Sequence, residues 1–199
     1  MIRPWHWLER VPRGVLFALA GLIQVGLIAA IVIERAGILR NGTEVTLDTR
    51  PVDPRDILRG DYVRLGYVIS TVRLGALEGT RAQGRDSTIF VTLAPQPDGF
   101  YGAVAAHLEL VPVTADEVLI KGRLTQGYNC GPQARAFCST ANVVYGLERF
   151  FVPEGEGHAI ESARNAGKVS VVAAVDRSGR AAIKRLLIDG KPVYDEPSF

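Results

Sequence analysis

The hydrophobic pattern divides the chain into one uninterrupted apolar run near the N-terminus and a long region of alternating positions. Residues 15–33 (VLFALAGLIQVGLIAAIVI) carry no charge, and Gln24 is the only strongly polar side chain among them. A helix over this run would be roughly 28 Å long, close to the hydrocarbon thickness of a bilayer, about 30 Å. The apolar part of a cleaved signal peptide is shorter and ends at a small-x-small site. The run therefore predicts an uncleaved transmembrane helix over 15–33.

Alternation of apolar and polar residues dominates the rest of the chain. In residues 61–70 (DYVRLGYVIS), every second residue from Val63 to Ile69 is apolar and falls on one face, as in a half-buried strand. Turn-forming pairs such as Asp189-Gly190 separate similar runs. The expected strands cover 44–49, 61–70, 87–93, 101–111, 117–124, 142–152, 169–175 and 181–188. About eight antiparallel strands predict a mainly β fold, either a sandwich or barrel-like.

One short helix is expected within this β-rich region. Residues 157–166 (GHAIESARNA) would place Ile160 and Ala163 against the sheet, and Gly167 is suited to end the helix.

The flanking charges predict how the chain is oriented. Arg3, Arg10 and Arg13 precede the apolar run, whereas Arg35 and Arg40 follow it. Positive flanks stay in the cytoplasm, and long segments cross the membrane largely regardless of charge. We therefore expect a short basic cytoplasmic N-terminus (1–14), the transmembrane helix (15–33), a linker (34–42) and an extracytoplasmic β-rich domain (43–199). In a bacterial cell this domain would be periplasmic and the helix would lie in the inner membrane.

The charge balance limits the classes of partner. The formal net charge is +2, and residues 34–199 carry equal numbers of acidic and basic residues. A nucleic-acid partner is therefore not expected, because such binding depends on a basic surface. The lipid bilayer is the expected partner of residues 15–33.

The two cysteines lie close together in the chain. Cys130 and Cys138 flank a segment containing Gly131-Pro132, which suits a loop disulfide in an oxidising compartment. Two unrelated buried thiols are the alternative. Two cysteines and three scattered histidines do not predict a metal site, and no cofactor is expected.

The most distinctive polar segment precedes the predicted strand at 61–70. Residues 50–62 (RPVDPRDILRGDY) alternate acidic and basic side chains, including Asp53, Arg55, Asp56 and Arg59. One interpretation is a structural turn in which the arginine and aspartate side chains of the segment form forked ion pairs with one another. A polar site is the other, in which the two aspartates act as acid and base of an envelope hydrolase and the arginines bind an anion. The neighbouring arginines would lower the pKa of both carboxyls, which weakens the acid–base interpretation.

Other enzyme classes lack their residues in this sequence. The segment shares a short likeness with membrane signal peptidases, but Val52 and Asp53 stand where a serine nucleophile would be needed. No P-loop, GxGxxG, Gly-x-Ser-x-Gly or His-Glu-x-x-His occurs. Glu148, Glu154 and Glu161 are potential metal ligands, although glutamates beside glycine turns are usually solvated or capping.

Two motifs carry a resemblance to a known family. Gly60-Asp61-Tyr62, Leu65 and Tyr67 match the signature of the GDYXXLXY family of bacterial membrane-anchored proteins. A second motif, residues 145–155 (YGLERFFVPEG), is also similar to that family. The candidate functional residues of the second motif are Tyr145, Gly146, Glu148, Phe151, Pro153, Glu154 and Gly155. The resemblance implies a membrane-anchored topology and a multi-pass membrane protein as partner, and it supplies no catalytic residues.

These observations favour a non-enzymatic envelope protein that binds or supports another integral membrane protein. The alternatives are the hydrolase described above and a periplasmic domain that binds a small ligand or lipid in a cavity enclosed by the sheets.

Overall fold

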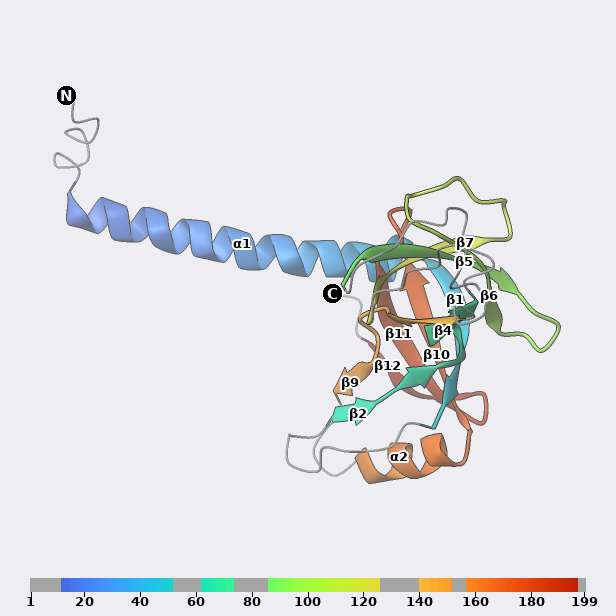
Figure 1. Ribbon diagram of the computed structural model, residues 1–199. Coiled ribbons are helices and arrows are strands. Elements are labelled where there is room, and N and C mark those ends of the chain that lie inside the picture. The colour runs from blue at the N-terminus through green and yellow to red at the C-terminus, as the bar shows by residue number, and fades with distance from the viewer. Residues whose placement is uncertain (1–11, 52–61, 74–85, 126–139, 152–156, 197–199) are drawn as a thin grey trace. The chain divides into compact units, whose positions relative to one another are not determined.

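The computed structural model describes residues 12–51, 62–73, 86–125, 140–151 and 157–196 (Figure 1). The chain forms two compact units, Met1–Gly37 and Ile38–Phe199.

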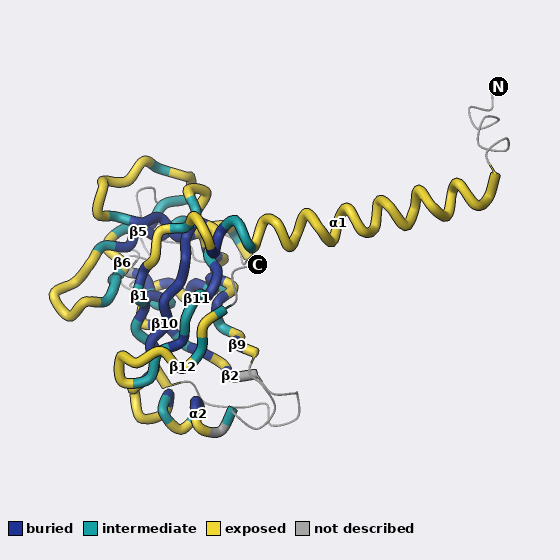
Figure 2. The backbone as a smooth tube through the Cα atoms, turned by 180° about the vertical axis from the view of Figure 1, so that it is seen from behind, coloured by how far each residue is buried: buried dark blue, intermediate teal, exposed yellow. Residues whose placement is uncertain are grey.

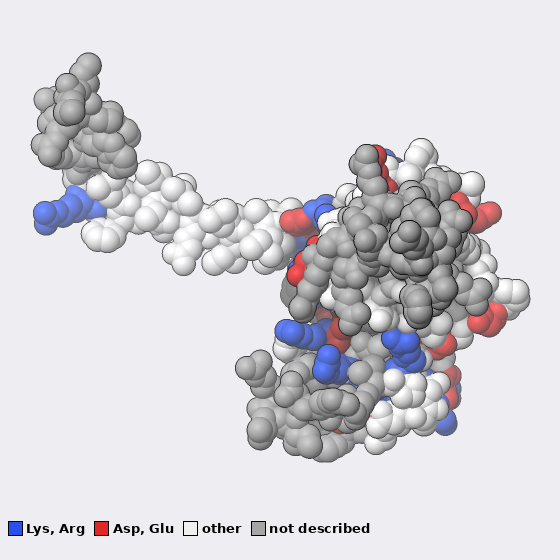
Figure 3. All heavy atoms as spheres, viewed as in Figure 1, with Lys and Arg blue, Asp and Glu red and all other residues white. Residues whose placement is uncertain are grey.

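Helix α1 (Arg13–Asn41) contains the predicted span and continues beyond it. Its apolar part is fully exposed, long enough and apolar enough to cross a membrane. Figure 2 shows this part in yellow throughout, and Figure 3 shows white atoms along most of its length. Residues 34–42, expected as a linker, are helical as far as Asn41.

The end of α1 belongs to the second unit. Ile38 and Leu39 are buried against Ala174 and Ala182. The helix stops at Gly42, whose N–H donates to the Ile38 carbonyl oxygen at 2.8 Å. A Cβ at position 42 would lie 2.6 Å from that oxygen, so only glycine fits this exit from the helix.

Strands make up most of the second unit, which confirms the mainly β class. They are β1 (Thr43–Arg50), β2 (Tyr62–Arg64), β3 (Gly66–Tyr67), β4 (Thr71–Arg73), β5 (Thr88–Pro95), β6 (Tyr101–His107), β7 (Val118–Leu124), β8 (Thr140–Val144), β9 (Arg149–Phe151), β10 (Val169–Val175), β11 (Ala181–Ile188) and β12 (Lys191–Asp195). The short 3₁₀ turn η2 (Val68–Ser70) follows β3, and helix α2 (Gly157–Asn165) precedes β10.

The described strands form two five-stranded sheets and one two-stranded sheet. Their orders are β12-β11-β10-β1-β3, β4-β8-β7-β5-β6 and β2-β9. Every described pair is antiparallel. One cluster of buried side chains joins residues from all three sheets, including Val45, Val91 and Phe150, so the sheets share a single packed core.

The predicted strand over 61–70 is wrong as a single element, although its alternation is right. Val63, Leu65, Tyr67 and Ile69 are all buried, as expected. The segment nevertheless changes partner along its length, because β2 pairs with β9 and β3 pairs with β1. Together with β4, which follows directly and pairs with β8, residues 62–73 link all three sheets.

Three further boundaries differ from the prediction. The run 142–152 is divided into β8 and β9 by Gly146, whose φ is +83°. The run 101–111 ends as a strand at His107. Strand β12 was not expected, because its exposed side chains leave no clear alternation. It pairs with β11 after a turn in which Asp189 and Gly190 both have positive φ, as a tight hairpin requires.

The predicted helix is confirmed as α2. Ile160 is buried and Ala163 packs against the core. The chain leaves the helix at Gly167, whose φ is +69°.

Candidate functional site

The two sequence motifs meet in space although about 80 residues separate them. Strand β2 pairs with β9, so that Tyr62 lies opposite Phe151 and Val63 opposite Phe150. Beyond the paired strands, the Leu65 N–H donates to the Glu148 carbonyl oxygen at 2.9 Å. The signature segment and the second motif therefore form one structural unit at one end of the domain, next to α2 (Figure 1).

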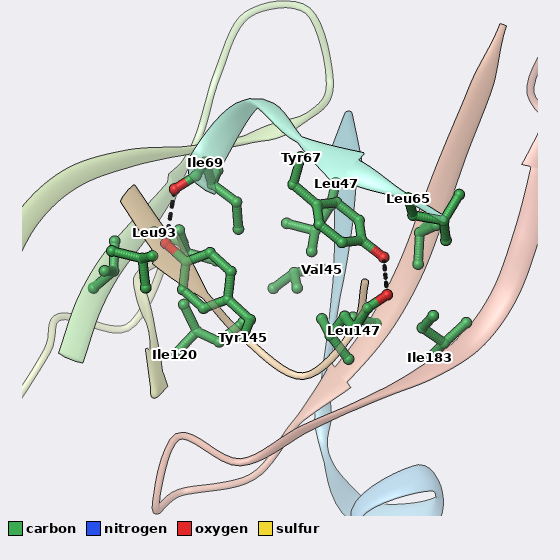
Figure 4. Close-up of a cluster of buried hydrophobic side chains, with 14 of the residues drawn as sticks. Val45, Leu47, Leu65, Tyr67, Ile69, Leu93, Ile120, Tyr145, Leu147 and Ile183 are labelled. Atoms are coloured by element: carbon green, nitrogen blue, oxygen red, sulfur yellow. Dashed lines mark hydrogen bonds between the residues drawn. The ribbon is translucent and has the colours of Figure 1, made fainter. Parts of the chain in front are cut away.

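Two buried tyrosines link these segments through hydrogen bonds that run in opposite directions. The Tyr67 hydroxyl donates to the Leu147 carbonyl oxygen at 2.8 Å, and the Tyr145 hydroxyl donates to the Ile69 carbonyl oxygen at 2.7 Å. Figure 4 shows both of these hydroxyl–carbonyl bonds, with the two tyrosine rings lying among aliphatic core side chains. We call Tyr67, Ile69, Tyr145 and Leu147 the tyrosine clasp. Each of the two segments supplies one hydroxyl donor and one backbone acceptor, so the clasp needs both.

A tight turn presents the acceptors of the second motif. The Glu148 carboxylate accepts the N–H of Tyr145 at 2.6 Å and the N–H of Gly146 at 2.9 Å. Gly146 has positive φ at this turn, a conformation that favours glycine. The second-motif residues Tyr145, Gly146 and Glu148 thus hold the Leu147 carbonyl in place for Tyr67.

The environment of the clasp keeps both tyrosines protonated. Burial raises the pKa of Tyr67 well above its usual value of 10, and the Glu148 carboxylate raises it further. The pKa of Tyr145 is raised by the same two causes in the same order. Both hydroxyls therefore stay protonated hydrogen-bond donors at neutral pH.

Arg164 is a buried residue of this region that the sequence analysis did not identify. Its side chain is only 1% exposed, and its Nη1 donates to the Arg64 carbonyl oxygen at 2.7 Å. Its Nε and Nη2 donate to the Asn165 side-chain oxygen at 3.2 and 2.9 Å. Arg164 follows the core residue Ile160 by one helical turn, a spacing that could have placed it on the buried face. It ties α2 to β2.

The structure describes only some of the remaining candidate residues of the two motifs. Leu65 is buried in the core, and Phe151 is 72% exposed on β9. Several candidates lie outside the described residues, namely Asp53, Arg55, Asp56, Arg59, Gly60, Asp61, Pro153, Glu154 and Gly155. The hydrolase interpretation, which needs four of them, stays a prediction.

The structure bears on the predicted disulfide and on the potential metal ligands only where it describes their residues. Cys130 and Cys138 lie outside it. Within the described ranges, no group of three or more His, Cys, Asp and Glu side chains could hold a metal ion. The Glu148 carboxylate already binds two backbone amides there.

Comparison with known proteins agrees with the two motifs. A family model described as "GDYXXLXY protein" matches residues 24–186, which include the second half of the apolar run and both motifs. No curated protein and no solved structure matches the chain. Since the family match covers most of the chain and the resemblance noted in the sequence is confirmed, the chain belongs to the GDYXXLXY protein family.

Proposed function

We propose that this chain is a single-pass protein of the bacterial inner membrane that serves as a non-enzymatic accessory subunit of another integral membrane protein. The observation that carries the proposal is the apolar span of helix α1, none of which is buried by the described part of the chain. Such a surface is stable in a bilayer and costly in water. The helix then acts as a signal anchor, with the N-terminus in the cytoplasm and the β domain in the periplasm.

The internal use of the motif side chains supports a binding role over a catalytic one. The hydroxyls of Tyr67 and Tyr145 donate to backbone carbonyls inside the core, and the Glu148 carboxylate accepts from backbone amides. Catalytic groups need free lone pairs or protons facing a substrate. The described motif residues instead stabilise the end of the domain to which the polar segment is attached.

The proposed contact surface is the polar segment from Asp53 to Asp61, together with Phe151. Asp61 directly precedes Tyr62, which lies opposite Phe151 in the β2–β9 pair. A largely exposed phenylalanine is typical of a protein–protein contact, where aromatic residues supply much of the binding energy. Arg55 and Arg59 are the proposed contact residues of the polar segment.

The filled interior disfavours the alternative of a ligand enclosed by the sheets. The inward side chains of both large sheets, such as Leu47, Ile89 and Leu186, are fully buried and belong to one cluster. An enclosed ligand would need a cavity of a few hundred Å³ in that position.

Crosslinking in intact membranes tests the proposal. Photo-reactive residues would be placed along 15–33 and at Arg55, Arg59 and Phe151, with Val193 on the exposed edge strand β12 as the control position. We expect a single membrane protein to crosslink at the first set and not at Val193, and to be identified by mass spectrometry. Replacing 15–33 with an unrelated span should abolish crosslinking through the helix. Equal background at all positions would refute the accessory-subunit proposal.

A further inference from the structure

A groove opens on the β domain near the start of β1. It has a volume of about 660 Å³ and is lined by Asn41, Thr43, residues 110–113, residues 117–119 and residues 175–177. We call it the juxtamembrane groove. Its volume falls in the range of small-molecule sites, about 300–1,000 Å³.

The connection to α1 limits how far this groove lies from a membrane. Asn41 and Thr43 line the groove, and the apolar run ends at Ile33. Residues 34–41 are helical, so the chain advances by only about 12 Å between Ile33 and Asn41. If residues 15–33 cross a bilayer, as proposed above, Asn41 follows the end of the span by eight residues, so the groove includes the part of the domain that is nearest to the membrane along the chain.

One wall of the groove is apolar and exposed. Leu110 is 56% exposed and Val113 is 37% exposed, and both border the groove with Pro112 between them. Exposed large aliphatic side chains that gather at one place mark a site for an apolar partner. The floor is formed by the buried residues Val118, Leu119 and Val175.

Two carboxylates, Glu117 and Asp176, and one guanidinium, Arg177, line the groove. The Asp176 carboxylate accepts bonds from Arg180 at 2.7 and 2.9 Å and from the Ser178 hydroxyl at 2.7 Å. The Glu117 carboxylate accepts the hydroxyl and the N–H of Thr114 at 2.8 and 3.1 Å. Arg177 is exposed and makes no hydrogen bond or ion pair with any residue that the structure describes. Its guanidinium is therefore available to an anion.

We propose that the juxtamembrane groove binds an anionic phospholipid from the membrane that holds α1. The phosphate pairs with the Arg177 guanidinium, and the upper part of an acyl chain lies along Leu110 and Val113. An arginine fits this role because its planar fork matches phosphate oxygens. The inference rests on the membrane anchoring proposed above and not on a protein partner.

Native mass spectrometry of the full chain in mild detergent tests this proposal. Phosphatidylglycerol and phosphatidylcholine with the same acyl chains would be titrated separately. We expect the wild type to bind phosphatidylglycerol more tightly. Arg177→Ala should weaken that binding about fivefold, since one cation near a lipid surface contributes about 1 kcal/mol. Its binding of phosphatidylcholine should change little.

Matched variants make the result specific. Arg123 is an exposed arginine at the other end of β7 and does not line the groove. Arg123→Ala should therefore leave the affinities for both lipids unchanged. Leu110→Asp should weaken binding of both lipids, whereas Val193→Asp on β12 should not. Equal binding of the two lipids by the wild type, or equal losses in Arg177→Ala and Arg123→Ala, would overturn the proposal.

The outcome is separable from that of the crosslinking experiment. If the wild type does not prefer phosphatidylglycerol but still crosslinks to a membrane protein, the lipid site is refuted and the accessory-subunit proposal stands. A wild type that is extracted from membranes by alkaline carbonate would refute the anchoring on which both proposals depend.

Discussion

Single side chains at the junction of the two motifs act through hydrogen bonds to the backbone. Tyr67 is fully buried, and its hydroxyl has one partner, the Leu147 carbonyl oxygen. A buried carbonyl that loses its donor costs the full penalty of desolvation, about 1–3 kcal/mol. Tyr67 therefore contributes to stability through its hydroxyl as well as its ring.

Tyr67→Phe should lower the free energy of unfolding of the β domain by about 1–2 kcal/mol, because the Leu147 carbonyl is left unpaired. Chemical denaturation of the full chain in detergent measures this change. Tyr101→Phe is the control, since the half-buried Tyr101 makes no hydroxyl bond within the described ranges, and it should change little. Equal losses in the two variants would show that the clasp bond contributes nothing.

The surface pair formed by Glu44 predicts a pH dependence. The Glu44 carboxylate lies 2.7 Å from both Lys184 Nζ and Arg185 Nη2. The hydrogen bond from Lys184 is the largest cause that lowers the pKa of Glu44 from its usual 4.5. The ionised form therefore favours the folded state. This stabilisation is complete above the unfolded pKa and is lost as pH falls through the lower folded pKa.

Glu44→Gln should therefore reduce stability at pH 7 by less than about 1 kcal/mol, because the pair is partly exposed and screened. The difference from wild type should shrink in 1 M salt and disappear in acid. Thermal unfolding at several pH values measures it. Glu109→Gln, at an exposed carboxyl that takes no part in the pairs above, is the control. A pH-independent effect of Glu44→Gln would contradict the assignment.

At the scale of elements, strand β7 shows how packing constrains the backbone beneath the clasp. Gly122 lies on β7, opposite Ile89 of β5. A Cβ there would collide with the Val143 side chain and lie 3.1 Å from the Tyr145 ring. The closeness of β7 to the β8–Tyr145 segment thus depends on the missing side chain.

Gly122→Ala should lower the free energy of unfolding by about 1–3 kcal/mol, because Val143 and Tyr145 must move to admit the methyl group. It should also reduce the effect of a second substitution, Tyr145→Phe, which a double-mutant cycle measures. Gly102→Ala is the control. Its Cβ would meet only the exposed side chain of Gln96, which can move, so a change within about 0.5 kcal/mol is expected.

At the scale of the whole molecule, the proposed topology predicts the redox state of the cysteines. A periplasmic domain folds in an oxidising compartment, so Cys130 and Cys138 should form a disulfide. Protein isolated from cells and denatured without reductant should therefore take up no alkylating reagent, and should gain two labels after reduction. A cytoplasmic β domain would leave both thiols labelled without reductant, which would contradict both the disulfide and the orientation.

The sequence by itself determined the class of most segments and the direction in which most side chains face. The uncharged run over 15–33 identifies α1, and the period of two places Val63, Leu65, Tyr67 and Ile69 in the core. These features depend on residues near one another in the chain, where helix and strand periods leave a direct trace.

Only the tertiary structure decided which strands meet and what the motifs do. Alternation marks a buried face equally well for any partner, so it could not show that 62–73 pairs in turn with β9, β1 and β8. The reciprocal hydroxyl bonds of Tyr67 and Tyr145 join residues about 80 positions apart. The burial of Arg164 likewise depends on the strand against which α2 packs. These contacts join residues that are far apart in the chain, so no local sequence pattern predicts them.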